Sequence, residues 1–444
     1  MSHELVPVSR CDAPTCRRPS GELRVPGDKS MSHRAIMLAA LADGVSHIDG
    51  FLEGADTLAT VAAFRSMGVR IDAPCASQRV VNGVGLHGLV APDAAIDCGN
   101  AGTGMRLLAG LLAGQAFDSV LTGDESLSRR PMQRVIEPLL RMGADIRAGD
   151  GGLPPLRVSG GRALRGMVHE PVVASAQVKS AILLAGLYAT GTTEVRESHP
   201  TRDYSERMLA AFGWPIEFAS GWARLSGGHR LHATDVVVPA DFSSAAFFLV
   251  AASLVPGSDL RLRAVGMNPR RTGLLAVLRL MGADIEESNR TSRDGETVAD
   301  LQVRHAPLHG IDVPPELVAD MIDEFPILFV AAAAASGTTR IRGAAELRVK
   351  ESDRIAVMLR GLQAMGVAVA EHVDGATIRG GPFQGARIDS AGDHRVAMSF
   401  AVAAQLAVDE VQIDDCHNVA TSFPGFVALA RHCGMNLHVG KPVS

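Results

Sequence analysis

The chain has 444 residues, with 43 Lys and Arg against 48 Asp and Glu, so its formal net charge is −5, and aromatic residues make up 4%. This balance excludes a general nucleic-acid binder, which needs a basic face or stacking rings. A hydrophobic share of 47% with 20% charged residues is typical of a globular protein. At about 150 residues per domain, the length predicts two to three domains.

The N-terminal segment up to Gly21 is polar and contains three prolines, so we expect no secretory signal there. The longest apolar runs, 181–189, 245–252 and 325–335, fall short of the about 20 residues that a membrane span needs. We therefore expect buried helices in a cytoplasmic protein. The six cysteines form no CxxC pair, which predicts free thiols, and Cys11 and Cys16 lack the further ligands of a metal site.

One segment recurs six times along the chain: an amphipathic helix, a glycine turn and a strand, as in FRSMGVRID and LRLMGADIE. Glycine suits the turn because helices often end in a left-handed residue. The turn glycines are Gly68, Gly143, Gly213, Gly282, Gly366 and Gly434.

A second segment alternates with the first and consists of an Ala- and Leu-rich helix with a polar start. The starts are Ser30, Asn100, Ser175, Asp241, Asp323 and Asp393. A helix that is apolar nearly all round must be buried on all sides. The pattern therefore predicts six α/β units, three before and three after residues 236–241, in two pseudo-symmetric domains. A solenoid is the competing architecture, which the dissimilar polar starts disfavour.

The polar helix starts predict an anion-binding site, because a helix N-terminus carries unpaired N–H groups and partial positive charge. Capping alone explains one set of polar residues: Ser30, Thr103, Ser175, Asp241 and Asp323. It does not explain the cations of the same turns, which oppose the helix dipole. We interpret these as ligands of bound anions: Lys29, Arg34, Arg106, Lys179 and Arg395.

Two acids stand out as candidates for proton transfer, Asp323 and Glu351, because each lies beside cations or other acids. The alternative is that each is a helix cap or an ion-pair partner, which spacing alone favours. The chain has neither a metal-binding motif nor a nucleophile elbow. We therefore expect acid–base chemistry without a metal.

Seven motifs in order resemble the 5-enolpyruvylshikimate-3-phosphate synthase family, from about residue 21 to about residue 426. They are PGDKSMSHRA, CGNAGTGMR, LTGDESLSRRPM, SAQVKSAILLAG, DEFPILFVAAA, RVKESDR and DHRVAM. The first and fourth motifs are similar to the bacterial branch that includes glyphosate-tolerant members.

The resemblance implies an α/β fold of two pseudo-symmetric domains, each with three βαβαββ units around buried helices, the inside-out barrel of enolpyruvyl transferases. The expected domains are residues 27–239, and residues 1–26 plus 240–444, with the active site in the cleft between them. The implied reaction moves the enolpyruvyl group of phosphoenolpyruvate to the 5-hydroxyl of shikimate 3-phosphate and releases phosphate. It needs no cofactor and is a step of the shikimate pathway toward chorismate and the aromatic amino acids.

The resemblance also implies roles for residues that match the motifs. Those expected to bind shikimate 3-phosphate are Lys29, Ser30, Arg34, Ser175, Ala176, Gln177, Arg202, Asp323 and Lys350. Those expected to bind phosphoenolpyruvate are Lys29, Gly102, Arg130, Gln177, Arg354 and Arg395. The expected catalytic residues are Asp323, which would accept the hydroxyl proton, Glu351, which would exchange a proton with the methylene carbon, and Lys29.

Two departures from the family pattern have consequences. Many members have a Lys before Phe-Pro near the C-terminus, where this chain has Thr421 and Ser422. Tolerant relatives often have Ala where this chain has Gly102, so we expect glyphosate to inhibit. We expect a monomer without nucleic-acid or membrane partners. The alternatives are a UDP-N-acetylglucosamine enolpyruvyl transferase, disfavoured because no cysteine lies in a suitable Gly-rich loop, and a non-catalytic anion-binding repeat protein.

Overall fold

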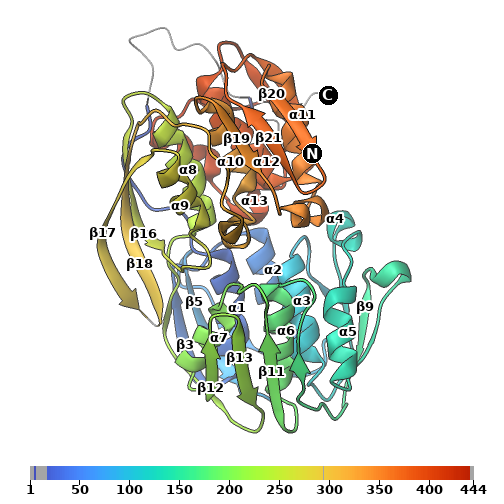
Figure 1. Cartoon of the computed structure of the whole chain (residues 1–444). Helices are drawn as coiled ribbons and strands as arrows, with labels where there is room; N and C mark the ends of the chain where they lie inside the picture. The colour runs from blue at the N-terminus through green and yellow to red at the C-terminus, as the bar shows by residue number, and fades with distance from the viewer. Residues whose placement is uncertain (1–4, 7–17, 294, 441–444) are drawn as a thin grey trace. The chain divides into compact units, whose positions relative to one another are not determined.

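The computed structural model describes residues 5–6, 18–293 and 295–440, and Cys11 and Cys16 lie outside these residues. The chain divides into two compact units (Figure 1). Unit 1 contains the described residues up to Pro26, then Pro239–Thr291 and Thr297 onward, and unit 2 contains Gly27–Val238 and Ser292–Glu296. The second crossing lies between Val238 and Pro239, whereas the sequence places it one residue later.

Each unit has one hydrophobic core built around three inner helices. In unit 2 they are α1 (Lys29–Leu41), α3 (Gly102–Leu112) and α6 (Ala176–Gly186), and in unit 1 α8 (Phe242–Leu254), α10 (Phe325–Ala334) and α12 (His394–Ala403). Every residue of α8 and of α12 is buried. These are the Ala- and Leu-rich segments, so the prediction of buried helices is confirmed.

Three outer helices accompany the inner ones in each unit. They are α2 (Ala55–Ser66), α5 (Gln133–Arg141) and α7 (Tyr204–Ala211) in unit 2, and α9 (Gly273–Leu280), α11 (Arg354–Ala364) and α14 (Phe426–His432) in unit 1. Each of the six predicted turn glycines lies two residues after the last residue of its helix, and their φ angles run from +81° to +106°. Other residues rarely adopt this left-handed backbone, so the prediction of glycine turns is confirmed.

The described strands form six sheets, three in each unit. Those of unit 2, in sheet order, are β14 (Leu231–His232), β3 (Ala42–Asp49), β5 (Gln78–Val84) and β4 (Arg70–Asp72), with β15 (Val236–Val237) also on β3; β6 (Ile96–Asp97), β7 (Ser119–Thr122), β9 (Leu156–Ser159) and β8 (Asp145–Arg147); and β10 (Val168–His169), β11 (Thr192–Arg196), β13 (Trp222–Ser226) and β12 (Ile216–Ala219).

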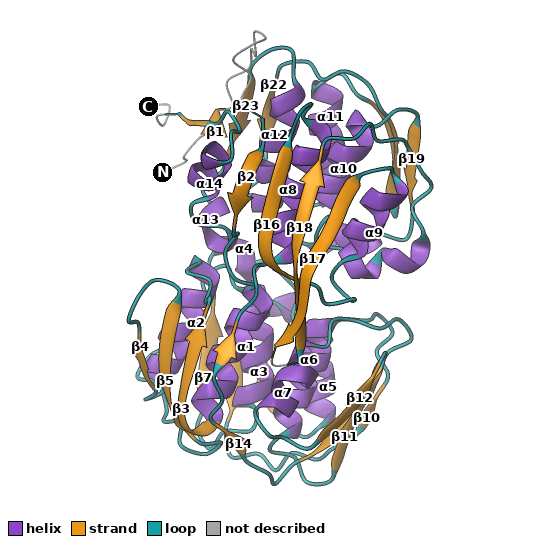
Figure 2. Ribbon diagram, turned by 90° about the vertical axis from the view of Figure 1, so that its left-hand side faces the viewer, coloured by secondary structure: helices purple, strands orange, loops and turns teal. Residues whose placement is uncertain are grey.

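Those of unit 1 are β2 (Ser20–Leu23), β16 (Asp259–Gly266), β18 (Glu296–Arg304) and β17 (Asp284–Arg293); β19 (Thr338–Ile341), β21 (Gly375–Arg379) and β20 (Ala368–His372); and β22 (Ala386–Asp389), β23 (Val411–Asp414), β1 (Leu5–Val6) and β24 (His438–Val439). Figure 2 shows the first of these sheets lying across the outside of unit 1, where β16 packs on α8. The prediction of an α/β fold with helices inside and strands outside is confirmed.

One pairing pattern is repeated in these sheets, and the sheet of β6, β7, β9 and β8 shows it. β6 and β7 are parallel, β9 is antiparallel to β7, and β8, which precedes β9 in sequence, pairs with the other side of β9. Three places are filled from elsewhere in the chain. β2 precedes α1 but pairs with β16, and β14 precedes α8 but pairs with β3. N-terminal β1 lies between β23 and β24, in the place that a fourth strand of the last of the six repeats would take. The two units are therefore each closed by strands from distant parts of the sequence.

The closest helix packing in unit 2 depends on Gly110 of α3. A Cβ atom at this position would lie 2.1 Å from the backbone oxygen of Ala181 in α6. We therefore expect Gly110→Ala to force the two helices apart and to lower the free energy of unfolding by about 1–3 kcal/mol. Urea unfolding measures it. A matched control is Gly381→Ala, where the added atom meets nothing within 4 Å and the backbone is not left-handed, so little change is expected.

No helix among the described residues is long and apolar enough to cross a membrane. Of the described cysteines, Cys98, Cys416 and Cys433 are buried and Cys75 is exposed, all as free thiols.

Candidate active site

The predicted site residues of unit 2 lie at the starts of its inner helices. Lys29 is the first residue of α1, and its Nζ lies 2.9 Å from Asp56 Oδ2 of α2. Arg34, one turn further, is buried and donates through Nε to Ser205 Oγ and through Nη2 to Ser180 Oγ, both at 2.7 Å. Its Nη1 donates to the Ser30 carbonyl at 2.9 Å. These bonds fasten α1 to α6 and α7.

Arg34 faces a further cation, Arg202. Burial, followed by the charge of Arg202, lowers the pKa of Arg34 to about 10, so it stays protonated at neutral pH. The neighbouring His33 is fully buried, and burial with the charges of Lys29 and Arg34 lowers its pKa to about 3. His33 is therefore neutral, and its Nδ1 lies 2.7 Å from Thr60 Oγ1.

A second cluster of unit 2 surrounds the start of α3. Arg106 Nη1 donates to Gln177 Oε1 at 2.7 Å, and Gln177 Nε2 donates to Thr103 Oγ1 at 2.8 Å. Arg130 Nη2 donates to Asn100 Oδ1 at 2.7 Å. A Cβ atom on Gly102 would lie 3.2 Å from the Nη1 atoms of both arginines. Two guanidinium groups thus meet beside the N–H groups of one helix start, which favours an anion there.

The start of α6 carries Ser175, whose side chain accepts from the Val178 N–H as the predicted cap, and Ala176, which is buried. Gln177 and Ser180 on the same helix contact Arg106 and Arg34, respectively. α6 therefore joins the two clusters of unit 2.

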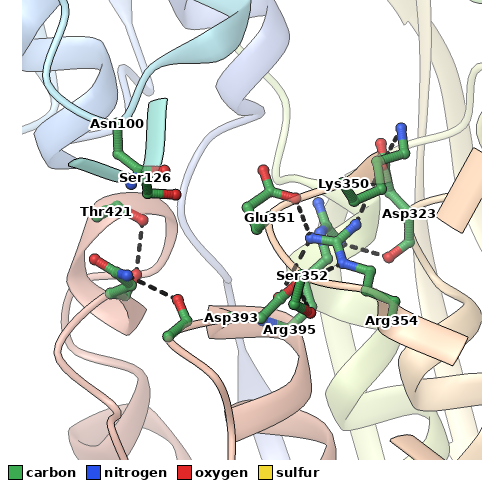
Figure 3. Close-up of polar contacts among 12 residues, drawn as sticks. Asn100, Ser126, Asp323, Lys350, Glu351, Ser352, Arg354, Asp393, Arg395 and Thr421 are labelled. Atoms are coloured by element: carbon green, nitrogen blue, oxygen red, sulfur yellow. Dashed lines mark hydrogen bonds and ion pairs between the residues drawn. The ribbon is translucent and has the colours of Figure 1, made fainter. Parts of the chain in front are cut away.

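The predicted site residues of unit 1 form one connected network (Figure 3). Asp323 Oδ1 lies 3.6 Å from Lys350 Nζ and 3.8 Å from Arg354 Nη1. Arg354 Nη2 donates to Glu351 Oε2 at 2.6 Å. Arg395 Nη1 donates to the Asp323 carbonyl at 3.0 Å. The two acids predicted for proton transfer therefore share a single guanidinium neighbour.

Asp393 fixes the guanidinium group of Arg354 from the other side. Arg354 Nε donates to Asp393 Oδ2 at 2.8 Å, and the arginine side chain is only 2% exposed. Burial works against charge on Arg354, but Asp393 and Glu351 raise its pKa above the ordinary value. Burial likewise opposes the charge on Asp393, yet Arg354 keeps the pKa of this carboxyl below its usual range. Arg354 is thus a fixed cation.

The cap predictions are correct at two of five positions. Ser175 and Asp241 cap α6 and α8 through side-chain bonds. Ser30, Thr103 and Asp323 are not caps: Asp28 caps α1, and no side chain caps α3 or α10. The Thr103 hydroxyl accepts from Gln177, and the Asp323 carboxylate faces cations, so both are engaged elsewhere.

The prediction that first-turn cations require a bound anion is wrong for Lys179. Its Nζ lies 2.8 Å from both Glu197 Oε2 and Glu206 Oε1, and all three side chains are buried. These carboxylates come from outside α6, so no pattern within the helix revealed them. Sequence reasoning also missed Asp56, the partner of Lys29, and Arg271, which contacts Asp323 at 3.0 Å.

Near the C-terminus, where many family members have a Lys before Phe-Pro, this chain has Thr421 and Ser422. Thr421, in α13 (Val419–Ser422), donates its hydroxyl to the Asn418 carbonyl at 2.6 Å. Asn418 Nδ2 in turn donates to the Gly392 carbonyl at 2.7 Å. This segment is held by hydrogen bonds between uncharged groups to the turn before Asp393.

Among the described residues, no group of three or more His, Cys, Asp or Glu could hold a metal ion.

Comparison with known proteins agrees with these features. The family described as EPSP synthase (3-phosphoshikimate 1-carboxyvinyltransferase) matches residues 15–429. A protein of that enzyme name from Xanthomonas campestris pv. campestris (strain B100) is 66% identical over 417 residues, 94% of this chain and 95% of the relative. One from Xanthomonas oryzae pv. oryzae (strain PXO99A) is 66% identical over 421 residues, 95% and 96% of the two chains.

A solved EPSP synthase from Acinetobacter baumannii superposes with a TM-score of 0.88 at 48% identity, and 99% of this chain and 100% of that chain are covered. A second structure from the same organism gives 0.87 at 46% identity, with the same coverage. The fold and these likenesses define a transferase. The chain belongs to the EPSP synthase (3-phosphoshikimate 1-carboxyvinyltransferase) family. The predictions of fold class, family and transferase activity are confirmed, against both alternatives.

Proposed function

We propose that the chain transfers the enolpyruvyl group of phosphoenolpyruvate to the 5-hydroxyl of shikimate 3-phosphate, and that residues of both units act on these substrates. The observation that carries this proposal is the network in which Asp323, Glu351 and Lys350 meet around the fixed cation Arg354. It combines two acids for proton transfer with cations for a carboxylate or phosphate, as an addition–elimination between anions requires.

Shikimate 3-phosphate is assigned to the cluster around α1 and to part of the Asp323 network. The assigned residues are Lys29, Ser30, Arg34, Ser175, Ala176, Gln177, Arg202, Asp323 and Lys350. Support comes from the two cations Arg34 and Arg202: the charge of Arg202 lowers the pKa of Arg34, and Glu206 and Asp28 each offset this repulsion only in part. A phosphate of about −1.5 to −2 charges would relieve that repulsion.

Phosphoenolpyruvate is assigned to Lys29, Gly102, Arg130, Gln177, Arg354 and Arg395. The support is the pair of guanidinium groups beside Gly102, together with the fork of Arg354. Arg forks match the geometry of carboxylates and phosphates. Arg106, which the sequence predicts to be an anion ligand without assigning it to either substrate, contacts Gln177 in the same cluster and belongs with this set.

In the proposed reaction, Glu351 delivers a proton to the methylene carbon of phosphoenolpyruvate, which leaves cationic character on the adjacent carbon. The 5-hydroxyl oxygen attacks that carbon while Asp323 accepts its proton, and a tetrahedral intermediate forms. The intermediate then loses phosphate and returns a methyl proton to Glu351, which forms the enol ether of the product. Lys29 stabilises charge on the phosphate group as it leaves. Positioning and fixed charge supply the remainder of the rate enhancement.

The proposal is tested by measuring phosphate release from the purified protein with phosphoenolpyruvate and either acceptor. We expect release with shikimate 3-phosphate, and 5-enolpyruvylshikimate 3-phosphate by mass spectrometry. Release only with UDP-N-acetylglucosamine would favour the other transferase. No phosphate release with either acceptor would contradict the proposed transferase activity.

Glyphosate should inhibit the enzyme measurably, although two motifs are similar to a branch with tolerant members. Gly102 leaves open the space between Arg106 and Arg130, and a methyl group there would lie 3.2 Å from each guanidinium. Gly102→Ala should therefore raise the inhibition constant for glyphosate by at least about tenfold, or 1.4 kcal/mol, with a smaller rise in KM for phosphoenolpyruvate.

Inhibition assays at fixed shikimate 3-phosphate measure both constants. Gly104→Ala is a useful comparison, because its Cβ would meet Ala101 and Thr60 rather than an arginine. Wild-type enzyme that is unaffected by glyphosate well above its KM for phosphoenolpyruvate would contradict this prediction.

We also propose a monomer in the cytoplasm, acting without a cofactor. Both substrates are phosphorylated anions, which do not cross membranes unaided. Size-exclusion chromatography with light scattering tests the oligomeric state, and a mass of twice 46.6 kDa would contradict it.

A further inference from the structure

Arg271 is a buried cation of unit 1 that no motif reveals. It lies in the turn between β16 and α9, and its side chain is only 5% exposed. A buried guanidinium is costly unless it is surrounded by acceptors. The contacts of Arg271 therefore show what holds it there.

Its first contact is with the proposed base. Arg271 Nη1 donates to Asp323 Oδ2 at 3.0 Å. The other oxygen, Oδ1, faces Lys350 at 3.6 Å and Arg354 at 3.8 Å. Oδ2 therefore has a short bond to Arg271, whereas the contacts of Oδ1 with Lys350 and Arg354, which are proposed to bind substrates, are longer.

Its second set of contacts ties Arg271 to the core. Nη2 donates to Ser243 Oγ in the first turn of α8 and lies 3.7 Å from Asp241 Oδ1, the cap of that helix. Nη1 also lies 3.5 Å from Glu324 Oε1, and Ser243 Oγ bonds the same glutamate. Because these partners are all buried, Arg271 connects the start of α8 rigidly to the start of α10.

We propose that Arg271 is a positioning residue for Asp323: it fixes Oδ2, so that Oδ1 remains aimed at the substrate hydroxyl while Lys350 and Arg354 turn to their ligands. This inference rests on the proposed function, in which Asp323 is the base. The charged groups that face the carboxylate include Arg271, Lys350 and Arg354, with Arg395 on its carbonyl and Glu324 next in sequence. Glu351 faces it through Arg354.

The test is a double-mutant cycle with Arg271→Met and Asp323→Asn, measured by steady-state kinetics on the full chain. Arg271→Met should lower kcat by about 10- to 100-fold with little change in either KM, because a misplaced base slows the reaction of bound substrate. The acidic limb of its kcat–pH profile should move to higher pH, since a cation that favours the ionised acid is lost. In the Asp323→Asn background the same change should cost no more than about twofold.

Arg270→Met is the matched control, because Arg270 precedes Arg271 and contacts Asp320 at 3.2 Å. It should leave kcat and the pH profile within about twofold of wild type, as for an independent site. If Arg271→Met does not fold, Arg271→Lys serves in its place: it retains the charge but not the fork, and should show a smaller loss of kcat with the same coupling to Asp323.

The outcomes separate this inference from the proposed function. Near-wild-type kcat in Asp323→Asn would overturn the base assignment itself. A disabled Asp323→Asn with near-wild-type Arg271 variants would overturn only the role of Arg271. Fully additive losses in the double variant would also overturn it, because Arg271 would then act independently of Asp323.

Discussion

Asp323→Asn should lower kcat by about 10²- to 10⁴-fold, the usual contribution of a positioned proton acceptor. The amide retains the shape of the carboxylate and can still accept from Arg271, but it cannot take the hydroxyl proton. KM for phosphoenolpyruvate should change little, because Arg354 remains fixed by Asp393 at 2.8 Å. Stopped-time phosphate release at saturating substrates measures kcat.

Asp320→Asn is the control for this variant. Asp320 lies three residues earlier, is also largely buried, and contacts Arg270 at 3.2 Å. It should retain most of the wild-type turnover. If Asp323→Asn also retains most of it, the base is a different residue.

Glu351→Gln separates the two proton transfers. It should suppress exchange of solvent deuterium into the methylene group of phosphoenolpyruvate, because its carboxyl is proposed to protonate that carbon. Asp323 is assigned to the hydroxyl, and Asp323→Asn should leave more of this exchange intact. The reverse ranking would exchange the two assignments.

The repeated architecture could be predicted because its signals are local. Each outer helix and its glycine are adjacent in sequence, and the left-handed φ of Gly68 or Gly434 requires nothing from the rest of the fold. The inner helices are apolar on all faces, so only burial accommodates them. Periodicity and turn chemistry therefore sufficed for these elements.

The exchange of strands could not be predicted from such signals. β2 carries the short sequence SGEL and precedes α1, but it pairs with Asp259–Leu262, more than 230 residues away. Its local pattern would suit either sheet. Pairing is decided by which edge is free once both cores have formed, and that is a property of the whole fold.

The candidate site was predictable in its cations but not in their partners. Residue type and motif placed Lys29 and Arg395 at helix starts, where the structure has them. The carboxylate partners of the site's cations lie on other helices, such as Asp56 on α2 and Asp393 before α12. The local sequence therefore suggests a more positive site than the structure has. Lys179 is the clearest case, because two buried carboxylates neutralise it.

Lys179→Met should lower the free energy of unfolding by about 3–5 kcal/mol, because it leaves buried carboxylates without their cation. The side chains of Lys179, Glu197 and Glu206 are 3%, 0% and 2% exposed, and both ion-pair distances are 2.8 Å. Burial opposes the charge on Lys179, but Glu206 and Glu197 together raise its pKa. Chemical denaturation at pH 7.5 measures the loss.

The loss should grow with pH. Burial raises the pKa of Glu206 even in the presence of Lys179, and without the lysine it must rise further. An acid with a raised folded-state pKa is fully stabilising below its unfolded value of about 4.3 and loses that contribution as pH rises through the folded value. The variant should therefore be closest to wild type near pH 5 and furthest from it near pH 8.

Arg196→Met is the matched control for this prediction. Arg196 lies on β11, one residue before Glu197, and its Nε is 2.6 Å from Glu194 Oε1, but its side chain is 54% exposed. An exposed pair of this kind contributes about 0–1 kcal/mol, so the control should change little at either pH. Equal losses in the two variants would show that burial does not set the role of Lys179. A loss near 4 kcal/mol only in Lys179→Met would identify it as an internal counter-ion of α6 rather than a ligand of substrate.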